Sequence, residues 1–358
     1  MALRSAPIVI FGLLVSIGVS AGAATEPPKI SKPRSAMALP MNVQPLPPAV
    51  IDNSLSVGGD EVKGKEVDTR LTVDVRVNGH GPYHFIVDSG ADTSAVGLRI
   101  ARDLELPLGT PSILDGTVSR DIVDCVKVDQ LTLGPSVISN LELPALRETD
   151  MGGDGMIGID ALVHQRLMMD FERGLIKVED ASKPIKTNPG DIVIIARRKR
   201  GQLILTTVTT SGLPVDAVID TGSEVTIGNN ALREKLLRDD PRQFTTASAI
   251  GVTGAVTQIQ IAKIPELRLG PVVLHNVPVA FADLMPFKLF GLSDEPALLL
   301  GTDILNNFRR VSLDFIARKV RFQLRSCDAQ NIVTNTGFGI SFTSMVPVNR
   351  DPTICSKA

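Results

Sequence analysis

Two aspartates occupy matching places in two similar stretches of this 358-residue chain. Each follows an apolar strand-like segment and begins a short turn, Asp88–Gly90 in the first stretch and Asp220–Gly222 in the second. An acid at the end of an apolar strand is costly to bury, so it needs hydrogen-bond donors. The glycine of each turn lets backbone N–H groups approach the carboxylate. The hydroxyls of Ser89 and Thr221 stand beside the two acids and are available to lock one turn to the other.

Two carboxylates within hydrogen-bond reach cannot both ionise easily, so they share a proton and one pKa rises. Such a pair can polarise a water molecule with one oxygen and protonate a carbonyl group with the other. Hydrolysis of a peptide bond by this route needs neither a metal ion nor a covalent intermediate. The chemistry therefore depends on elements that bring both turns to one point.

An internal repeat supplies such elements. The stretch Leu71–Asp88 matches Leu203–Asp220 at an offset of 132 residues (220 − 88), and both read as a strand, a Gly/Pro turn and a second strand. Later stretches match at an offset that grows to 144 residues: Leu131–Pro135 with Leu267–Pro271, Ile157–Leu162 with Leu300–Leu305, and Met169–Val178 with Leu313–Phe322. The chain is therefore predicted to form two lobes of similar topology, with most of the extra residues of the second copy between Ala280 and Leu298.

Most segments of both copies are short, β-branched and separated by Gly, Pro or Asn, which predicts an all-β fold with a small helix or two per lobe. Helical patterns are confined to brief stretches such as Arg99–Leu104, Asn230–Arg238 and Asp303–Phe308. The predicted organisation is a signal peptide at 1–24, a Pro-rich linker or pro-segment at 25–60, lobe one at 61–182, lobe two at 190–326 and a C-terminal tail at 327–358.

These motifs resemble those of retropepsin-like and pepsin-like aspartic proteases, over roughly Val62 to Leu324. In each lobe a D-[ST]-G-[AS] turn is followed by an apolar pair and a glycine, and later by an apolar-apolar-Gly segment that leads into a short helix. The four segments are Ala95–Gly97, Thr226–Gly228, Met156–Gly158 and Leu299–Gly301. The resemblance implies two tandem retropepsin-like β-barrel lobes related by a pseudo-two-fold axis. Tyr83 precedes the catalytic turn and cannot be the flap tyrosine of pepsin-like enzymes, so a fused retropepsin pair is the better comparison.

The same resemblance implies an aspartic endopeptidase with Asp88 and Asp220 as its catalytic pair and no cofactor or metal ion. The residues expected to support the pair are Ser89, Gly90, Thr221, Gly222 and Ser223. A flap hairpin is expected over each lobe, with Gly116, Thr117, Val118, Val252, Thr253 and Gly254 as substrate-binding residues. The partner would be an extended polypeptide that lies like an added strand, with Phe281–Leu292 as a candidate wall of apolar pockets. The alternative is a non-catalytic peptide-binding or assembly module that keeps this fold.

Other features favour simpler interpretations. A net charge of −2 and a pI near 6.1 supply no electrostatic case for nucleic acid as a partner. The G-x-G-x-x-G match at Gly153–Gly158 follows a polar segment rather than a strand, so it does not predict a dinucleotide site. The four histidines show no metal-binding spacing. The remaining candidates are expected to be structural: Arg197–Arg200 as a solvated turn, Asp92 and Glu224 facing solvent or paired with nearby basic residues, and Asp160 and Asp303 as N-terminal acids of short helices.

The N-terminus predicts export to the periplasm or the exterior. Arg4, an apolar run at Ile8–Val19 and the small residues Ala21–Ala24 have the layout of a secretory signal peptide. The run is short for a bilayer span, which needs about 20 residues, so membrane association is expected only if the segment is not cleaved. In an oxidising compartment Cys327 and Cys355 could pair and leave Cys125 as a buried thiol. With both lobes on one chain, the expected species is a monomer.

Overall fold

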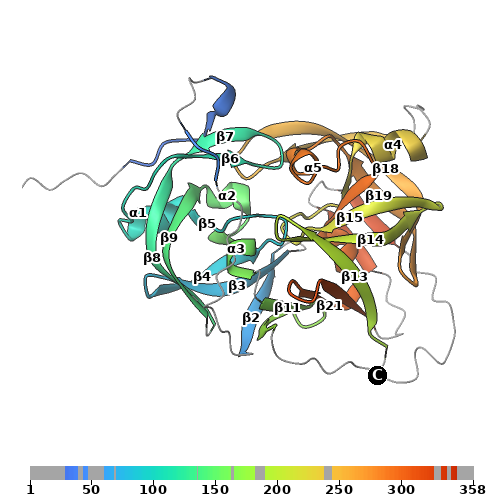
Figure 1. The fold of residues 1–358 in the computed structure, drawn as a ribbon, viewed down its shortest axis with the longest axis horizontal. Coiled ribbons are helices and arrows are strands. Elements are labelled where there is room, and N and C mark those ends of the chain that lie inside the picture. Colours follow the sequence, from blue (N-terminus) through green and yellow to red (C-terminus); the bar gives the residue numbers. More distant parts are fainter. Residues whose placement is uncertain are drawn as a thin grey trace, which may run out of the picture.

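A computed structural model describes residues 29–38, 43–46, 60–67, 70–134, 136–162, 165–181, 190–237, 244–325, 332–336 and 340–344. The predicted signal peptide, Cys327 and Cys355 lie outside these residues. Two lobes lie side by side, lobe one drawn in blue to green and lobe two in yellow to orange (Figure 1). Within the described part of the chain, no helix has the length and apolar character needed to cross a bilayer.

Lobe one is a closed barrel of six strands. The ring runs β3, β4, β10, β5, β9, β8 and back to β3, and each neighbouring pair is joined by backbone hydrogen bonds. Its elements are β2 (Asp60–Val67), β3 (Arg70–Val77), β4 (His80–Val87), β5 (Ala95–Gly97), α1 (Leu98–Asp103), β6 (Ser112–Asp115), β7 (Arg120–Val123), β8 (Cys125–Leu133), β9 (Ser136–Leu146), α2 (Glu148–Met151), β10 (Gly155–Ile157), α3 (Ile159–Leu162), β11 (Gln165–Asp170) and β12 (Leu175–Asp180).

Lobe two repeats this ring with β14, β15, β20, β16, β19 and β18. The predicted all-β fold of two tandem barrel lobes with short helices is therefore confirmed. Its elements are β13 (Ile192–Lys199), β14 (Gln202–Thr210), β15 (Leu213–Ile219), β16 (Ile227–Gly228), α4 (Asn230–Leu236), β17 (Thr245–Ile250), β18 (Val256–Leu269), β19 (Val272–Phe281), α5 (Met285–Leu289), β20 (Ala297–Leu300), α6 (Thr302–Leu305), β21 (Phe308–Asp314) and β22 (Lys319–Leu324).

Local sequence explains the hairpins that carry the two aspartates. The turn between β3 and β4 is Asn78-Gly79, and the turn between β14 and β15 is Ser211-Gly212. All four residues have positive φ angles, which is the type I′ geometry that matches the twist of a two-residue hairpin. The apolar side chains of these hairpins fill the barrels; Val75 and Phe85 in lobe one are fully buried.

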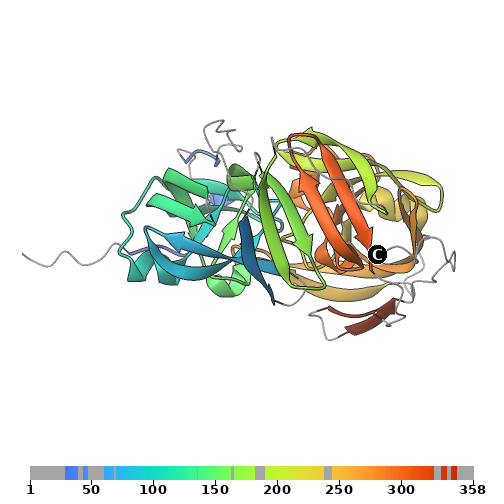
Figure 2. The same cartoon turned by 90° about the horizontal axis from the view of Figure 1, so that it is seen from below.

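The lobes are joined by a six-stranded antiparallel sheet, to which each lobe contributes three consecutive neighbours. The order is β2, β12, β11, β21, β22 and β13, so the pseudo-two-fold axis passes between β11 and β21. This sheet faces the viewer in the middle of the molecule when it is seen from below (Figure 2). Met168 lies opposite Ser312 at its centre.

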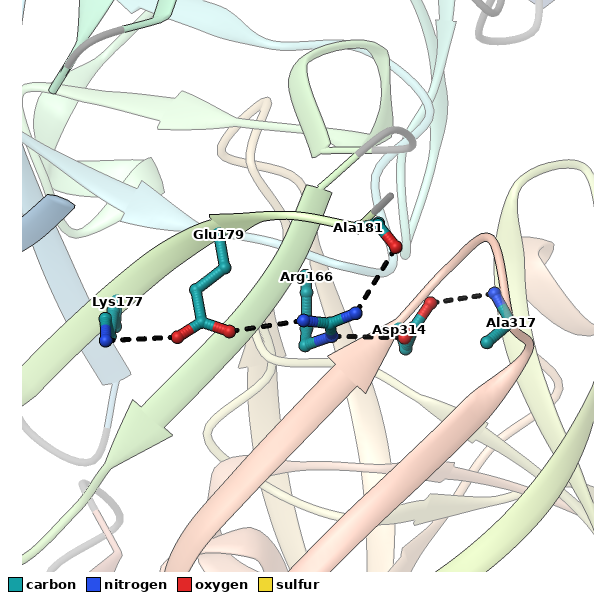
Figure 3. Close-up of polar contacts among 6 residues, drawn as sticks. All are labelled: Arg166, Lys177, Glu179, Ala181, Asp314 and Ala317. Atoms are coloured by element: carbon teal, nitrogen blue, oxygen red, sulfur yellow. Dashed lines mark hydrogen bonds and ion pairs between the residues drawn. The ribbon is translucent and has the colours of Figure 1, made fainter. Parts of the chain in front are cut away.

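Two charge pairs cross the junction between the lobes at symmetric positions. Arg166 lies opposite Asp314 in the β11–β21 register, and Asp170 lies opposite Arg310. The Nε atom of Arg166 donates to Asp314 Oδ2 at 3.1 Å, and that of Arg310 donates to Asp170 Oδ2 at 2.6 Å. Arg166 also donates to Glu179, so it bridges its own lobe and the other one (Figure 3). Arg166 and Asp314 are both buried, so each depends on the other to satisfy its charge.

Part of the predicted Pro-rich linker or pro-segment packs against lobe one. The short strand β1 (Arg34–Ser35) pairs with β7, and the segment Gln44–Leu46 runs along the other edge of the hairpin next to β6. Ile113 of β6 exchanges backbone hydrogen bonds with this segment at 2.7 and 2.9 Å. Ala36, in a 3₁₀ turn (η1, Ala36–Ala38), is buried against Ile113 and Ile122. Composition does not reveal this docking, because an open strand edge binds the backbone of the docked segment rather than particular side chains.

The tail beyond lobe two contains one further hairpin among its described residues. Its strands are β23 (Ile332–Thr336) and β24 (Ile340–Ser344), which pair antiparallel. This hairpin forms a sheet of its own, so the described part of the tail adds no strand to either barrel.

The buried charge pair in the interlobe sheet leads to a stability prediction. Arg166→Met leaves Asp314 buried without its guanidinium, and we expect a loss of about 3–5 kcal/mol in the free energy of unfolding, measured by urea titration. In an Asp314→Asn background, where the stranded charge is absent, the same substitution should cost much less. Lys235→Met, which removes the exposed ion pair with Glu295, should change stability by less than about 1 kcal/mol. Equal costs of Arg166→Met in both backgrounds would contradict this account.

Candidate active site

Asp88 and Asp220 sit at the carboxyl ends of β4 and β15, where each barrel opens towards the other lobe. A parallel neighbour anchors each one: the N–H of Asp88 donates to the carbonyl of Ile157 at 2.9 Å, and the N–H of Asp220 donates to Leu300 at 3.0 Å. The pairing of β4 with β10 and of β15 with β20 is the same in both lobes. The repeat therefore delivers each aspartate by the same strand geometry.

The turn after each aspartate folds back over its carboxylate. Oδ1 of Asp88 accepts hydrogen bonds from the N–H groups of Gly90 (2.8 Å) and Ala91 (3.1 Å). Oδ1 of Asp220 accepts equivalent bonds from Gly222 and Ser223, both at 3.1 Å. Backbone donors therefore hold Oδ1 of each carboxylate, and Oδ2 makes none of these bonds to the turn.

Ser89 and Thr221 lock the two turns together across the lobe boundary. The N–H of Ser89 donates to Thr221 Oγ1 at 2.9 Å, and this hydroxyl donates onward to the carbonyl of Val87 at 2.7 Å. Reciprocally, the N–H of Thr221 donates to Ser89 Oγ at 3.2 Å, and that hydroxyl donates to Ile219 at 2.9 Å. Both hydroxyl residues are buried, so this four-bond lock is shielded from competition by water.

The lock presses each turn against the opposite carboxylate. A Cβ atom on Gly90 would lie 2.8 Å from Cγ of Asp220, and a Cβ atom on Gly222 would overlap the carboxyl group of Asp88. Any larger residue at either position would separate the acids. The carboxyl groups of Asp88 and Asp220 are thus close enough to affect each other's pKa.

The closeness of these acids changes their ionisation. Burial raises the pKa of Asp220, and the charge of Asp88 raises it further, to about 8. Burial also raises the pKa of Asp88, against the opposing effects of the Gly90 and Ala91 N–H groups and of the charge of Arg70. The pair therefore retains one proton well above the pH at which an ordinary aspartate loses it.

Two ion pairs between the lobes flank the dyad, and the sequence had not specified them. Asp92 accepts from Arg200 at 2.6 Å, and Glu224 accepts from Arg70 at 2.7 Å. In each pair the acid follows its lobe's Asp-Ser/Thr-Gly turn and the arginine belongs to the other lobe. Asp92 and Glu224 are therefore partnered rather than free in solvent, and Arg200 is not merely part of a solvated turn. The four-residue spacing from Asp88 and from Asp220 is the signal that could have suggested a symmetric role.

A second pair of acids supports the turns from behind. Asp160 accepts from the N–H and hydroxyl of Ser94 at 3.0 and 2.7 Å, and Asp303 accepts from Thr226 in the same way. Burial raises the pKa of both carboxyl groups, to about 6 for Asp303. Their side chains reach the segment that follows each turn and do not line the cleft, which agrees with a structural role.

The dyad lies in a cleft of about 530 Å³ between the lobes. Apolar side chains form much of its wall, and several come from the extra segment of lobe two: Leu284, Pro286, Leu289 and Phe290. This segment includes α5, and its predicted position beside the cleft agrees with the structure. Lobe one has no segment of equal length here, so the two halves of the cleft differ in shape.

Two hairpins contribute residues to the wall of the cleft, and their strands β6, β7 and β18 lie near the top of the molecule in Figure 1. The lobe-one flap joins β6 to β7, and the lobe-two flap joins β17 to β18. Ser119 and Thr253 hydroxyls meet at 2.9 Å between the flaps, and the carbonyl of Thr117 accepts from the N–H of Met285 at 3.3 Å. Of the predicted flap residues, those lining the cleft are Gly116, Thr117, Val118 and Val252, whereas Thr253 and Gly254 do not line it.

A family model described as aspartyl protease matches residues 73–161 and 206–304. The two matches fall one in each barrel and together cover more than half of the chain. The chain belongs to the aspartyl protease family. No curated protein matches it significantly in sequence. The predicted resemblance of this aspartyl protease family member to tandem retropepsin-like domains is confirmed. Among the described residues of this family member, no group of His, Cys, Asp or Glu side chains is arranged to hold a metal ion.

The hydroxyl lock leads to a prediction on stability. Thr221→Val keeps the shape of the side chain but leaves the buried N–H of Ser89 without an acceptor, so we expect a loss of about 2–4 kcal/mol in the free energy of unfolding. Thr221→Ser is the matched control, because it keeps the hydroxyl and makes lobe two match Ser89 of lobe one. It should retain most of the stability in a denaturant titration. A valine variant as stable as the serine variant would show that the lock contributes little.

Proposed function

We propose that this protein is an aspartic endopeptidase that hydrolyses peptide bonds with a water molecule activated by Asp88 and Asp220. The observation that carries the proposal is that different lobes deliver two carboxyl groups to one cleft, where each packs against the turn that holds the other. Backbone N–H groups of each acid's own turn bind one oxygen of its carboxyl group. The second oxygen is therefore available to exchange a proton with water or substrate. Membership of the aspartyl protease family supports the same reaction class.

The reaction follows from a dyad that holds one proton. The ionised carboxylate accepts a proton from water as the water oxygen bonds to the peptide carbonyl carbon, and the protonated carboxyl gives its proton to the carbonyl oxygen. The resulting gem-diol returns a hydroxyl proton to the second acid. The first acid then passes its proton to the leaving nitrogen as the C–N bond breaks. Both acids end in their starting states, and no covalent enzyme intermediate forms.

The cleft suits an extended polypeptide. Its wall includes two β-hairpins whose backbone can pair with a strand-like ligand. Apolar residues near the dyad, such as Met156 and Ile227, favour apolar side chains beside the scissile bond. The longer lobe-two wall, with Leu289 and Phe290, offers a larger apolar surface on one side of that bond.

Both lobes contribute one acid from the same chain, so a monomer is the proposed active species. Export to the periplasm or exterior is proposed on the strength of the N-terminal signal pattern at residues 1–24, which lies outside the described residues. A non-catalytic peptide-binding module is the competing function, and cleavage assays separate the two.

Single substitutions in the dyad test the proposed reaction. Asp88→Asn and Asp220→Asn should each lower kcat/KM on a peptide library by at least about 10²–10⁴-fold, because each removes a proton-transfer group. Asp129→Asn changes an exposed acid on β8 and should leave cleavage unaltered. A statine-type inhibitor should block the wild-type protein. If the wild-type protein binds peptides but cleaves none between pH 3 and 9, the binding-module function would stand instead.

The dyad also predicts that one substitution has opposite effects on activity and on stability. Cleavage requires the retained proton, so it should fall as pH rises through about 8, the pKa of Asp220. A raised carboxyl pKa means that the folded state binds this proton more tightly than the unfolded state does. The stability that the bound proton contributes is therefore complete below about pH 3.8 and is lost as pH rises towards 8. Asp220→Asn should therefore be inactive, yet at pH 8 it should be more stable than the wild-type protein by about 1–3 kcal/mol. This gain is smaller than the full pKa shift would give, because the carboxyl group opens to the cleft. Thermal denaturation of both proteins at pH 4 and pH 8 measures the difference, and an equal pH dependence in both would contradict the assignment.

A further inference from the structure

The two halves of the active site differ by one charge at equivalent positions. Arg70 is the first residue of β3 and Gln202 is the first residue of β14. Their separation of 132 residues equals that of Asp88 and Asp220. The repeat therefore places a guanidinium in lobe one where lobe two has a neutral amide.

Both side chains make the same pair of contacts with the opposite lobe. Arg70 donates to the carbonyl of Gly222 at 3.5 Å and to Glu224 at 2.7 Å. Gln202 donates to the carbonyl of Gly90 at 3.4 Å and, at 2.6 Å, to the acid four residues after Asp88. Arg70 and Gln202 thus make the same contacts with the opposite catalytic turn, but only Arg70 carries a charge.

The glycine held by each side chain packs against the other lobe's aspartate. Gly222 lies against the carboxyl group of Asp88, and Gly90 lies against that of Asp220. Arg70 therefore stands behind the glycine that contacts Asp88. Its side chain is only 14% exposed, so its charge is weakly screened by solvent.

The other charged groups around the cleft are also held in ion pairs, as Arg70 is with Glu224. Arg200 pairs with Asp92 and its side chain is 33% exposed, so it is better solvated than Arg70. The remaining charged residues that line the cleft are Glu224 from the second turn, Asp115 from the lobe-one flap, which pairs with Arg120, and Asp150 from α2, which pairs with Arg147. Arg70 acts on Asp88, whose pKa its charge lowers.

We propose that Arg70 is a positioning residue that assigns the two roles in the dyad, with Asp88 as the ionised base that accepts the proton of water and Asp220 as the acid that protonates the carbonyl oxygen. The assignment rests on the proposed endopeptidase function. Asp220 has no such positive charge behind the glycine that it contacts, because the equivalent residue, Gln202, is neutral.

The test is the pH profile of kcat/KM for peptide cleavage by the full chain. Arg70→Gln gives both lobes the same neutral residue, and we expect the acid limb, which reports protonation of Asp88, to move up by about one pH unit. Arg70→Lys keeps the charge and should hold the acid limb near its wild-type position even if kcat falls. Arg200→Gln, which removes the ion pair of the other lobe, is the matched control and should leave the acid limb in place.

Moving the arginine from lobe one to lobe two by substitution gives a second, independent measurement. Gln202→Arg puts a guanidinium behind the glycine that contacts Asp220, so we expect the alkaline limb to move to lower pH. In the double variant with Arg70→Gln, the base and acid roles should exchange and the acid limb should return towards its wild-type pH. This arm remains informative if Arg70→Gln alone fails to fold.

The outcomes separate this inference from the proposed function. Absence of wild-type cleavage at every pH would overturn the endopeptidase function itself. Cleavage that depends on Asp88 and Asp220, with a uniform loss in Arg70→Gln at all pH values, would leave the function intact and reduce Arg70 to a structural role. An equal shift of the acid limb in Arg200→Gln would also overturn the specific role of Arg70.

Discussion

The reciprocal hydrogen bonds between Ser89 and Thr221 hold together two acids that would separate if each lobe were free. Mutual repulsion and loss of hydration both oppose bringing two carboxylates together. The lock overcomes this with four buried hydrogen bonds that cross the lobe boundary. It works only while both turns have the same conformation, which is why strand, turn and supporting acid recur in each lobe. The dyad is therefore a property of the lobe pair and not of either lobe.

The interlobe sheet sustains that pairing at a distance from the dyad. Its two charge pairs are related by the pseudo-two-fold axis, Arg166 with Asp314 and Arg310 with Asp170. Such an arrangement is self-complementary, as in an isologous interface between identical subunits. Asp170 and Asp314 also accept backbone N–H groups from the turns that follow them. Each acid thus shapes its own lobe and selects the register of the other.

Departures from symmetry are concentrated around the cleft. Arg70 of lobe one has Gln202 as its equivalent in lobe two. The apolar segment around α5 belongs to lobe two alone, and Gln44–Leu46 runs along the edge of the lobe-one flap. A symmetric site would give both acids the same environment and both halves of the cleft the same wall. Two lobes on one chain are free to differ, and here the differences lie in charge at the dyad and in shape along the cleft.

Sequence alone determined the repeat, the all-β barrels and the identity of the two acids, because strand periodicity, glycine turns and the D-[ST]-G pattern are local signals. The tertiary structure decided which groups meet across the lobes. Arg70 lies 154 residues before Glu224 and Arg200 lies 108 residues after Asp92, and no local pattern specifies such pairs. The docking of Ala36 on the flap depends on an open strand edge, which composition does not reveal. Raised pKa values likewise arise from burial and from a neighbour in the other lobe, and these exist only once the lobes have closed on each other.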